Sequence, residues 1–139
     1  MQVLAIETTG KEKSICLARD GRVIDQESFT GDLNLEFWPR LSRFLEKHKI
    51  KIGEIDLFAA SSGPGSWTGL RFGLAVLKGW AVATGKKVFV LSTSEIEQNL
   101  APGICGASVL ACRCDGGVDP EKVVVHYGHL PHFQRLKDG

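Results

Sequence analysis

The sequence predicts an α/β fold in which three antiparallel strands precede alternating helices and strands in a mixed sheet. Two observations support this prediction. Asp20-Gly21 separates two apolar-rich runs, and this pair of residues is a strong signal for a hairpin turn. From about residue 34 onward, stretches of helix length with helical spacing of apolar residues alternate with short apolar runs that are typical of buried strands.

Strands are expected where short apolar runs lie between turn signals. The expected strands are residues 2–7, 14–19, 23–29, 55–60 and 87–91, followed, beyond a boundary at Pro102-Gly103, by residues 107–112 and 122–127. Cys112 lies in one of these apolar runs, and we therefore expect it to be a small core residue.

Helices are expected at residues 34–48, 67–84 and 94–100. Asp32 or Asn34 can cap the first helix, and Ser94 can cap the third. Gly85 follows the second helix, where a glycine commonly ends a helix in the left-handed conformation. Pro39 lies inside the first helix and indicates either a later start or a kink.

The most informative stretch is residues 63–73, between an expected strand and the long second helix. Gly63, Pro64 and Gly65 favour a tight turn, and Ser66 or Thr68 can cap the helix that follows. The stretch is not a P-loop, which requires lysine and then serine or threonine after its last glycine. It is not a dinucleotide fingerprint either, because that motif requires glycine at position 68.

Two uses of this stretch stay open from the residues alone. One is an anion site at the start of the helix, to which Arg71 could contribute, although a single arginine there is also a common ion-pair partner. The other is close packing of the helix through Gly69 and Gly73, because glycines are poor helix formers and are usually kept for close approach.

Composition sets limits on function. The chain has 139 residues, of which 43% are hydrophobic and 24% are charged, and this suffices for one domain with a core. The net charge of +1 gives no general reason to expect nucleic-acid or membrane binding, and no apolar run approaches the roughly 20 residues of a membrane span. No signal peptide is recognisable, so we expect a cytoplasmic protein whose four cysteines are reduced.

Catalytic and metal-binding patterns are weak. Glu7 ends the first strand, but Thr9 stands where actin-like phosphotransferases generally need a glycine. We expect no metal or other cofactor, because the cysteines and histidines late in the sequence lack the paired C-x2-C units of zinc sites. The residues concerned are Cys105, Cys112, Cys114, His126, His129 and His132.

The first two helices carry more apolar surface than one contact with a sheet requires. The second is apolar on nearly all sides, and the first presents Leu35, Phe37, Trp38, Leu41, Phe44 and Leu45. Either both helices simply cover the sheet, or they also form an interface with a partner.

These residues resemble the TsaB family, also called YeaZ. The family motif G-P-G-S-F-T-G-[LV]-R-[IF]-G matches residues 63–73, except that Trp67 replaces phenylalanine. Residues 1–7 followed by Thr8-Thr9, and the Asp20-Gly21 hairpin, fit the same family. The motif residues are Gly63, Pro64, Gly65, Ser66, Trp67, Thr68, Gly69, Leu70 and Arg71. The resemblance covers roughly residues 1–100 and is loose beyond them.

The resemblance implies an actin-like, ribonuclease-H-like lobe over residues 1–100, with residues 101–139 as a short remnant of the family's second lobe, packed on the first. It implies a non-catalytic subunit that binds and activates a TsaD-type threonylcarbamoyltransferase in the synthesis of threonylcarbamoyladenosine in tRNA. A TsaE-type ATPase would join the larger complex, and tRNA would be contacted only through that complex. The isolated chain could form a homodimer.

The resemblance also assigns the partner interface to the first two helices. The interface residues that it implies are Leu35, Trp38, Leu41, Ser42, Leu45, Leu70, Gly73, Leu74 and Leu77. The alternative function is that of an actin-like nucleotide-binding protein or phosphotransferase. That alternative would require an acid-x-Gly turn at Glu7 and a hydroxyl-bearing turn after Asp115, and the sequence has neither.

Overall fold

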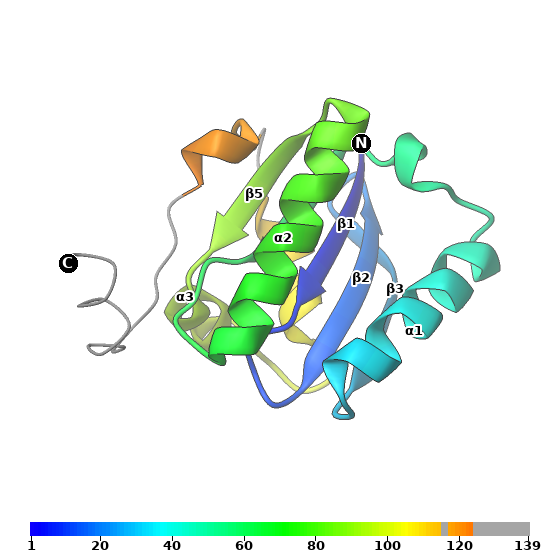
Figure 1. The fold of residues 1–139 in the computed structure, drawn as a ribbon. Helices are drawn as coiled ribbons and strands as arrows, with labels where there is room; N and C mark the ends of the chain where they lie inside the picture. The colour runs from blue at the N-terminus through cyan, green and yellow to red at the C-terminus, as the bar shows by residue number, and fades with distance from the viewer. Residues whose placement is uncertain (115–116, 124–139) are drawn as a thin grey trace.

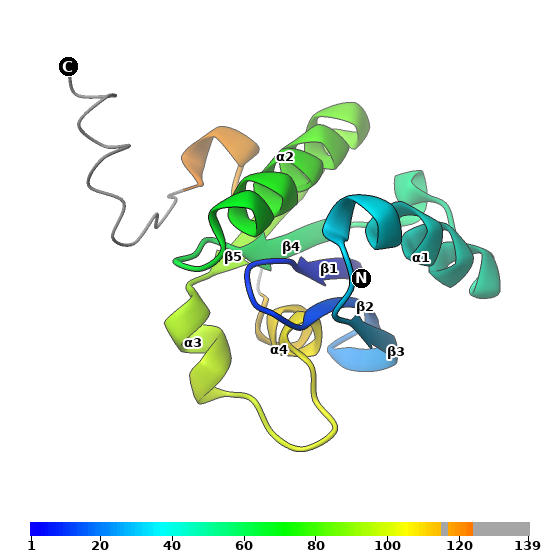
Figure 2. The same cartoon turned by 60° about the horizontal axis from the view of Figure 1, so that its bottom comes forward.

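The computed structural model describes residues 1–114 and 117–123, which form a five-stranded sheet with helices on both faces (Figure 1, Figure 2). The strands are β1 (Gln2–Glu7), β2 (Lys13–Arg19), β3 (Arg22–Phe29), β4 (Leu57–Ser61) and β5 (Lys87–Leu91). Their order across the sheet is β3-β2-β1-β4-β5. The pairs β1–β2 and β2–β3 are antiparallel, whereas β4 is parallel to both β1 and β5. The predicted α/β class and mixed sheet are therefore confirmed.

The hairpin between β2 and β3 turns at the predicted pair of residues. Asp20 and Gly21 both have positive φ angles, 52° and 79°. A two-residue type I′ turn requires positive φ at both central positions, and this turn matches the right-handed twist of the two strands. The backbone preferences of these two residues thus favour the turn that connects β2 and β3.

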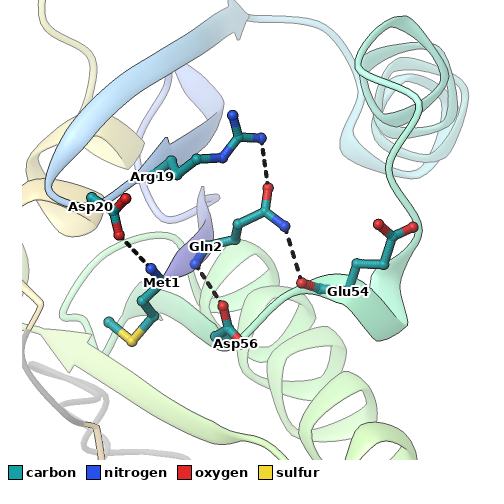
Figure 3. A network of polar contacts seen from close by, with 6 residues as sticks. All are labelled: Met1, Gln2, Arg19, Asp20, Glu54 and Asp56. Atoms are coloured by element: carbon teal, nitrogen blue, oxygen red, sulfur yellow. Dashed lines mark hydrogen bonds and ion pairs between the residues drawn. The ribbon is translucent and has the colours of Figure 1, made fainter.

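Polar contacts fix the start of β1 against segments that are distant in the sequence (Figure 3). The backbone N–H of Gln2 donates to Asp56 Oδ2 at 2.7 Å, and its side-chain amide donates to the carbonyl of Glu54 at 3.2 Å. The Arg19 guanidinium donates to the Gln2 side-chain oxygen at 2.9 Å. These bonds hold the 3-10 turn η1 (Ile52–Glu54) beside the first strand.

Two helices cover each face of the sheet (Figure 2). α1 (Leu33–Lys47) and α2 (Trp67–Thr84) lie on one face, and α3 (Thr93–Gln98) and α4 (Gly106–Arg113) lie on the other. Large Leu, Ile and Phe side chains fill the core under α1 and α2, whereas smaller Ala and Val side chains predominate under α4. α1 begins at Leu33, so Pro39 does not delay its start.

The helix ends follow the predicted signals with one exception. Asp32 caps α1 by accepting backbone N–H groups of its first turn, and Gly85 ends α2 with a φ of 73°. The exception is α3, which we expected Ser94 to cap. Its cap is Ser92, whose hydroxyl accepts the backbone N–H of Glu95, while the Glu95 carboxylate accepts the backbone N–H of Ser92.

The strand expected at residues 107–112 is wrong, because these residues form α4. A short apolar run fits a buried helix as well as a buried strand. Ala107, Leu110 and Ala111 recur at helical spacing and are buried against the sheet. Cys112 consequently points away from the core and is exposed, contrary to expectation, whereas Cys105 is buried.

The end of the described chain returns to the outer edge of β5. Val118 exchanges two backbone hydrogen bonds with Val88, at 2.7 and 2.8 Å. Lys122, expected in a strand, lies in the 3-10 turn η2 (Pro120–Lys122), and residues 124–127 of that expected strand lie outside the described residues. We predicted residues 101–139 to be a remnant of a second lobe, and this stays a prediction. Buried residues of α4 share one core with the sheet.

Candidate functional site

The glycine-rich stretch after β4 is bound to the segment that follows β1. Gly63 has a φ of 86°, which a glycine adopts without strain. Ser66 caps α2 by accepting the N–H of Gly69 at 3.2 Å, and its own N–H donates to the carbonyl of Thr9 at 2.9 Å. A Cβ at Gly65 would lie 2.8 Å from the Thr9 carbonyl oxygen. The turn and the end of β1 are therefore in direct backbone contact.

The glycines of α2 rest on the same segment. A Cβ at Gly69 would lie 1.9 Å from the carbonyl oxygen of Thr8, and one at Gly73 would lie 2.4 Å from Thr8 Oγ1. The Thr8 hydroxyl donates to the Gly69 carbonyl at 2.6 Å. Of the two uses that the sequence left open, close packing is the one that this geometry confirms.

Arg71 lies beside this contact on the exposed side of α2. Its guanidinium stands over the Trp67 ring, 5.3 Å from the ring centroid. This stacking lies within one turn of the helix and uses the residue at which the chain departs from the family motif. An ion-pair role for Arg71 across an interface stays a prediction.

Glu7 is buried at the carboxyl end of β1 and is held by its own turn. Its Oε1 accepts the N–H and the hydroxyl of Thr9, both at 2.7 Å, and burial raises the pKa of its carboxyl. Thr9 thus occupies the glycine position of a phosphotransferase turn and binds the acid instead.

A pocket of about 190 Å³ opens beside Glu7, where the parallel strands end. Its ionisable lining residues in the described part of the chain are Glu7, Glu12 and Glu97, so acids are present and lysine and arginine are not. A phosphate chain placed here would meet negative charge from the protein.

Within residues 1–114 and 117–123, no group of three or more His, Cys, Asp or Glu side chains is placed to hold a metal ion. His126, His129 and His132 lie outside the described residues, as does Asp115. No helix of the described part is long and apolar enough to cross a membrane.

The residues expected at a partner interface divide into two groups. Leu35 and Trp38 on α1 are 74% and 47% exposed, Ser42 is exposed and Leu45 is half-buried. The others lie in the core of the lobe, facing the sheet or Thr8, and so do not form its surface. These are Leu41, Leu70, Gly73, Leu74 and Leu77.

The outward side of α2 is formed by residues that the sequence analysis did not select. They line, together with Trp38, a hollow of about 400 Å³ between the helices; the lining is Trp38, Phe72, Ala75, Val76, Gly79 and Trp80. Because α2 is apolar on nearly all sides, its pattern does not reveal which side faces the sheet. We call Leu35, Trp38, Ser42, Leu45, Phe72, Ala75, Val76, Gly79 and Trp80 the α1–α2 face.

Aromatic contacts hold this face in shape. The Phe37 ring lies 5.0 Å from the Trp38 ring and 5.0 Å from the Phe72 ring, both edge-on. Trp38 and Phe72 lie 6.0 Å apart, and Trp80 packs on Phe58 of the sheet at 5.3 Å. These geometries are favourable for aromatic pairs, so the exposed rings are anchored from beneath.

Comparison with known sequences identifies relatives of this lobe. Residues 35–99 match the family model described as TsaD: tRNA N6-adenosine threonylcarbamoyltransferase. The chain is 33% identical over 78 residues to the tRNA threonylcarbamoyladenosine biosynthesis protein TsaB of Buchnera aphidicola. It is 29% identical over 104 residues to the tRNA N6-adenosine threonylcarbamoyltransferase of Kosmotoga olearia.

Solved structures with a similar fold include a protein of the same name. YeaZ from Pseudomonas aeruginosa superposes with a TM-score of 0.63 at 25% identity, over 68% of this chain and 44% of that one. The chain is similar to proteins of the TsaB (YeaZ) family. RuvC from T. thermophilus, solved with a Holliday junction substrate, has a TM-score of 0.50 at 12% identity, over 81% of this chain and 90% of that one, which shows a shared fold only. The lobe thus has the actin-like, ribonuclease-H-like fold that the family resemblance implied.

The chain aligns with only part of these relatives. The matched stretch covers 55% of this chain and 35% of the Buchnera TsaB protein, and 62% of this chain and 31% of the Kosmotoga transferase. The α1–α2 face lies in the matched lobe, since the family model covers residues 35–99.

Proposed function

We propose that the chain is a non-catalytic subunit that binds and activates a TsaD-type threonylcarbamoyltransferase in the synthesis of threonylcarbamoyladenosine in tRNA. The observation that carries this proposal is the α1–α2 face, a hollowed apolar surface on a lobe of the TsaB family. In this reading the face docks on the TsaD-type subunit and holds it in an active arrangement.

The chemistry of the α1–α2 face suits a protein interface. Trp38, Phe72 and Trp80 are large aromatic residues grouped around one hollow, and such residues are enriched among those that dominate binding energy. Leu35, at 74% exposure, extends the apolar surface beyond the hollow. Exposed apolar surface of this kind is typical of a site that a partner covers.

The surroundings of Glu7 support a role without catalysis. The carboxylate is engaged by Thr9, and the neighbouring pocket is lined by acids. The alternative function, an actin-like nucleotide-binding protein or phosphotransferase, needs groups that cradle phosphate, and the hydroxyls of Thr9 and Thr93 at this pocket already donate to Glu7 and to the Pro64 carbonyl. Isothermal titration calorimetry of the chain with ATP and Mg²⁺ tests it, and binding at micromolar strength would favour the alternative.

The remaining partners follow from family resemblance alone. A TsaE-type ATPase is proposed to join the larger complex, and tRNA is proposed to be contacted only through that complex. When the TsaD-type subunit is absent, a second copy of the chain is the other candidate for the same face.

Leu35→Asp tests the docking role of the face. Leu35 is highly exposed, and an acid in the first turn of α1 interacts favourably with the helix dipole, so the lobe stays folded. We expect co-purification with the TsaD-type subunit of the same organism to be lost, because a charge would be buried at the interface.

Leu100→Asp is the matched control. Leu100 is 48% exposed, but it follows α3 and is not part of the α1–α2 face. The control should keep full association. Equal association of the wild type, Leu35→Asp and Leu100→Asp on size exclusion would remove the α1–α2 face from the interface.

A further inference from the structure

One edge of the sheet is formed by β3, at the opposite end of the strand order from β5 (Figure 2). At the β5 edge the described chain returns and Val118 pairs with Val88, but no described strand pairs with the outer edge of β3. Val23 and Ile24 of this strand are 40% and 42% exposed. A free strand edge with exposed apolar side chains is a template for pairing with another chain, and natural proteins protect such edges by specific means.

A side chain of β3 itself covers one backbone group at this edge. The backbone N–H groups of an antiparallel edge strand alternate between its partner strand and the outer edge. The N–H of Gln26 donates to Asp25 Oδ1 at 2.8 Å, so it points to the outer edge. Ser28 lies two residues further along in the same register, and its N–H therefore points the same way. The outer edge of β3 thus presents donors at Gln26 and Ser28, and the first of them is occupied.

The Asp25 carboxylate is held in this position by the end of α1. Its Oδ2 accepts hydrogen bonds from Lys47 at 3.0 Å and from His48 at 2.8 Å, while Oδ1 accepts the N–H of Gln26. A strand added to this edge would have to place a carbonyl oxygen where Asp25 Oδ1 now lies. It would also cover a carboxylate that is 24% exposed, and removing a charge from water is costly.

We propose that Asp25 closes the free edge of the sheet by occupying the Gln26 amide, and that the chain it keeps away is β3 of a second copy. Two copies related by two-fold symmetry would pair β3 with β3 in antiparallel orientation. That orientation brings the Arg22 end of one strand to the Glu27 end of the other, where the opposite charges attract. This contact does not involve the α1–α2 face.

Asp25→Ala removes the acceptor and should open the edge. We expect the variant to form a dimer with a Kd at least about tenfold lower than that of the protein with Asp25. Asp25→Asn loses the charge, but its side-chain oxygen can still accept the N–H of Gln26, so its self-association should not change. Glu27→Ala is the matched control. Glu27 also lies on β3, but its carboxylate binds the Arg40 guanidinium at 3.0 Å and not an edge N–H, so the control should not dimerise either.

Sedimentation equilibrium measures the dimer Kd. All variants carry Leu35→Asp, so that self-association through the α1–α2 face does not contribute. Adding Ser28→Pro to Asp25→Ala should abolish the dimer, because proline removes an outward N–H and is tolerated on an edge strand. Unchanged self-association of Asp25→Ala would overturn the proposal. So would a dimer of Asp25→Asn that is equally tight, or a dimer of Asp25→Ala that persists with Ser28→Pro.

Hydrogen exchange of the unsubstituted chain tests the same contact without relying on a variant that has to fold. The Gln26 amide, bonded to Asp25, should exchange at least about tenfold more slowly than the Ser28 amide after correction for their intrinsic rates. Nuclear magnetic resonance resolves the two amides. Equal corrected rates would overturn the occupation of the Gln26 amide by Asp25, and with it the closure of the edge.

Discussion

Gly69→Ala tests the contact on which the placement of α2 depends. A Cβ at this position would lie 1.9 Å from the carbonyl oxygen of Thr8 and 2.9 Å from its carbonyl carbon. Both are backbone atoms, so rotation of a side chain does not relieve the overlap. The helix and the end of β1 have to move apart.

The expected magnitude follows from opposing effects. Alanine is the better helix former by about 1 kcal/mol, which favours the variant. Overpacking a tight site costs about 1–3 kcal/mol, and a backbone clash belongs at the upper end of that range. Separation also disrupts the hydrogen bond from Thr8 to the Gly69 carbonyl, which has a net worth of about 1 kcal/mol. We therefore expect the free energy of unfolding to fall by about 2–3 kcal/mol.

Urea unfolding followed by circular dichroism measures this change. Gly73→Ala should cost less than Gly69→Ala, because its Cβ would meet the Thr8 side chain, which can rotate. Thr8→Ala in the Gly73→Ala background should recover part of the loss, since it removes the atom that the new Cβ meets. A change of less than about 0.5 kcal/mol for Gly69→Ala would refute the reasoning.

Two further predictions concern pH. Burial raises the pKa of Glu7, so its contribution to the free energy of unfolding is fully present below the ordinary glutamate value of about 4.3 and is lost as the pH rises through the folded-state value. Glu7→Gln should therefore remove this fall in the free energy of unfolding with rising pH. Urea midpoints that decrease equally for the wild type and Glu7→Gln between pH 4 and pH 8 would contradict the prediction. For Asp25, burial acts to raise the pKa, but hydrogen bonds from His48 at 2.8 Å and Lys47 at 3.0 Å outweigh it and leave the pKa lowered. Its contribution is present above the ordinary aspartate value of about 3.9 and is lost as the pH falls through the folded-state value, so Asp25→Asn should be less stable than the wild type at pH 6, and the two should converge in acid. Identical urea midpoints at pH 6 would count against that coupling.

Local signals predicted most of the fold. Asp20-Gly21 and Gly85 determine a turn and a helix end through backbone preferences of their own, and these do not depend on distant residues. The run at residues 107–112 carried no such signal. It is as short as a strand and as apolar as a buried helix, and packing against the sheet decides between the two.

The interface residues selected from the sequence are mostly exposed on α1 and buried on α2, and their role at an interface stays a prediction. α1 has a polar side, so its exposed apolar residues Leu35 and Trp38 stand out as surplus. α2 has apolar residues on nearly all sides, and the sequence selected Leu74 and Leu77, which face the core. The spacing of apolar residues along such a helix does not show which side faces outward. That side is set by a contact with another part of the lobe.

That contact is the one between the glycines and Thr8, and it connects the family motif with the α1–α2 face. Gly69 and Gly73 can approach the end of β1 only if that side of α2 is turned toward the sheet. With this rotation fixed, Phe72, Val76 and Gly79 face outward, beside Trp38 of α1. A rotation of about 100°, which is one residue in an α-helix, would turn this apolar side away from α1 and place other residues along the hollow. The motif would therefore act on the proposed interface indirectly, by setting the orientation of α2.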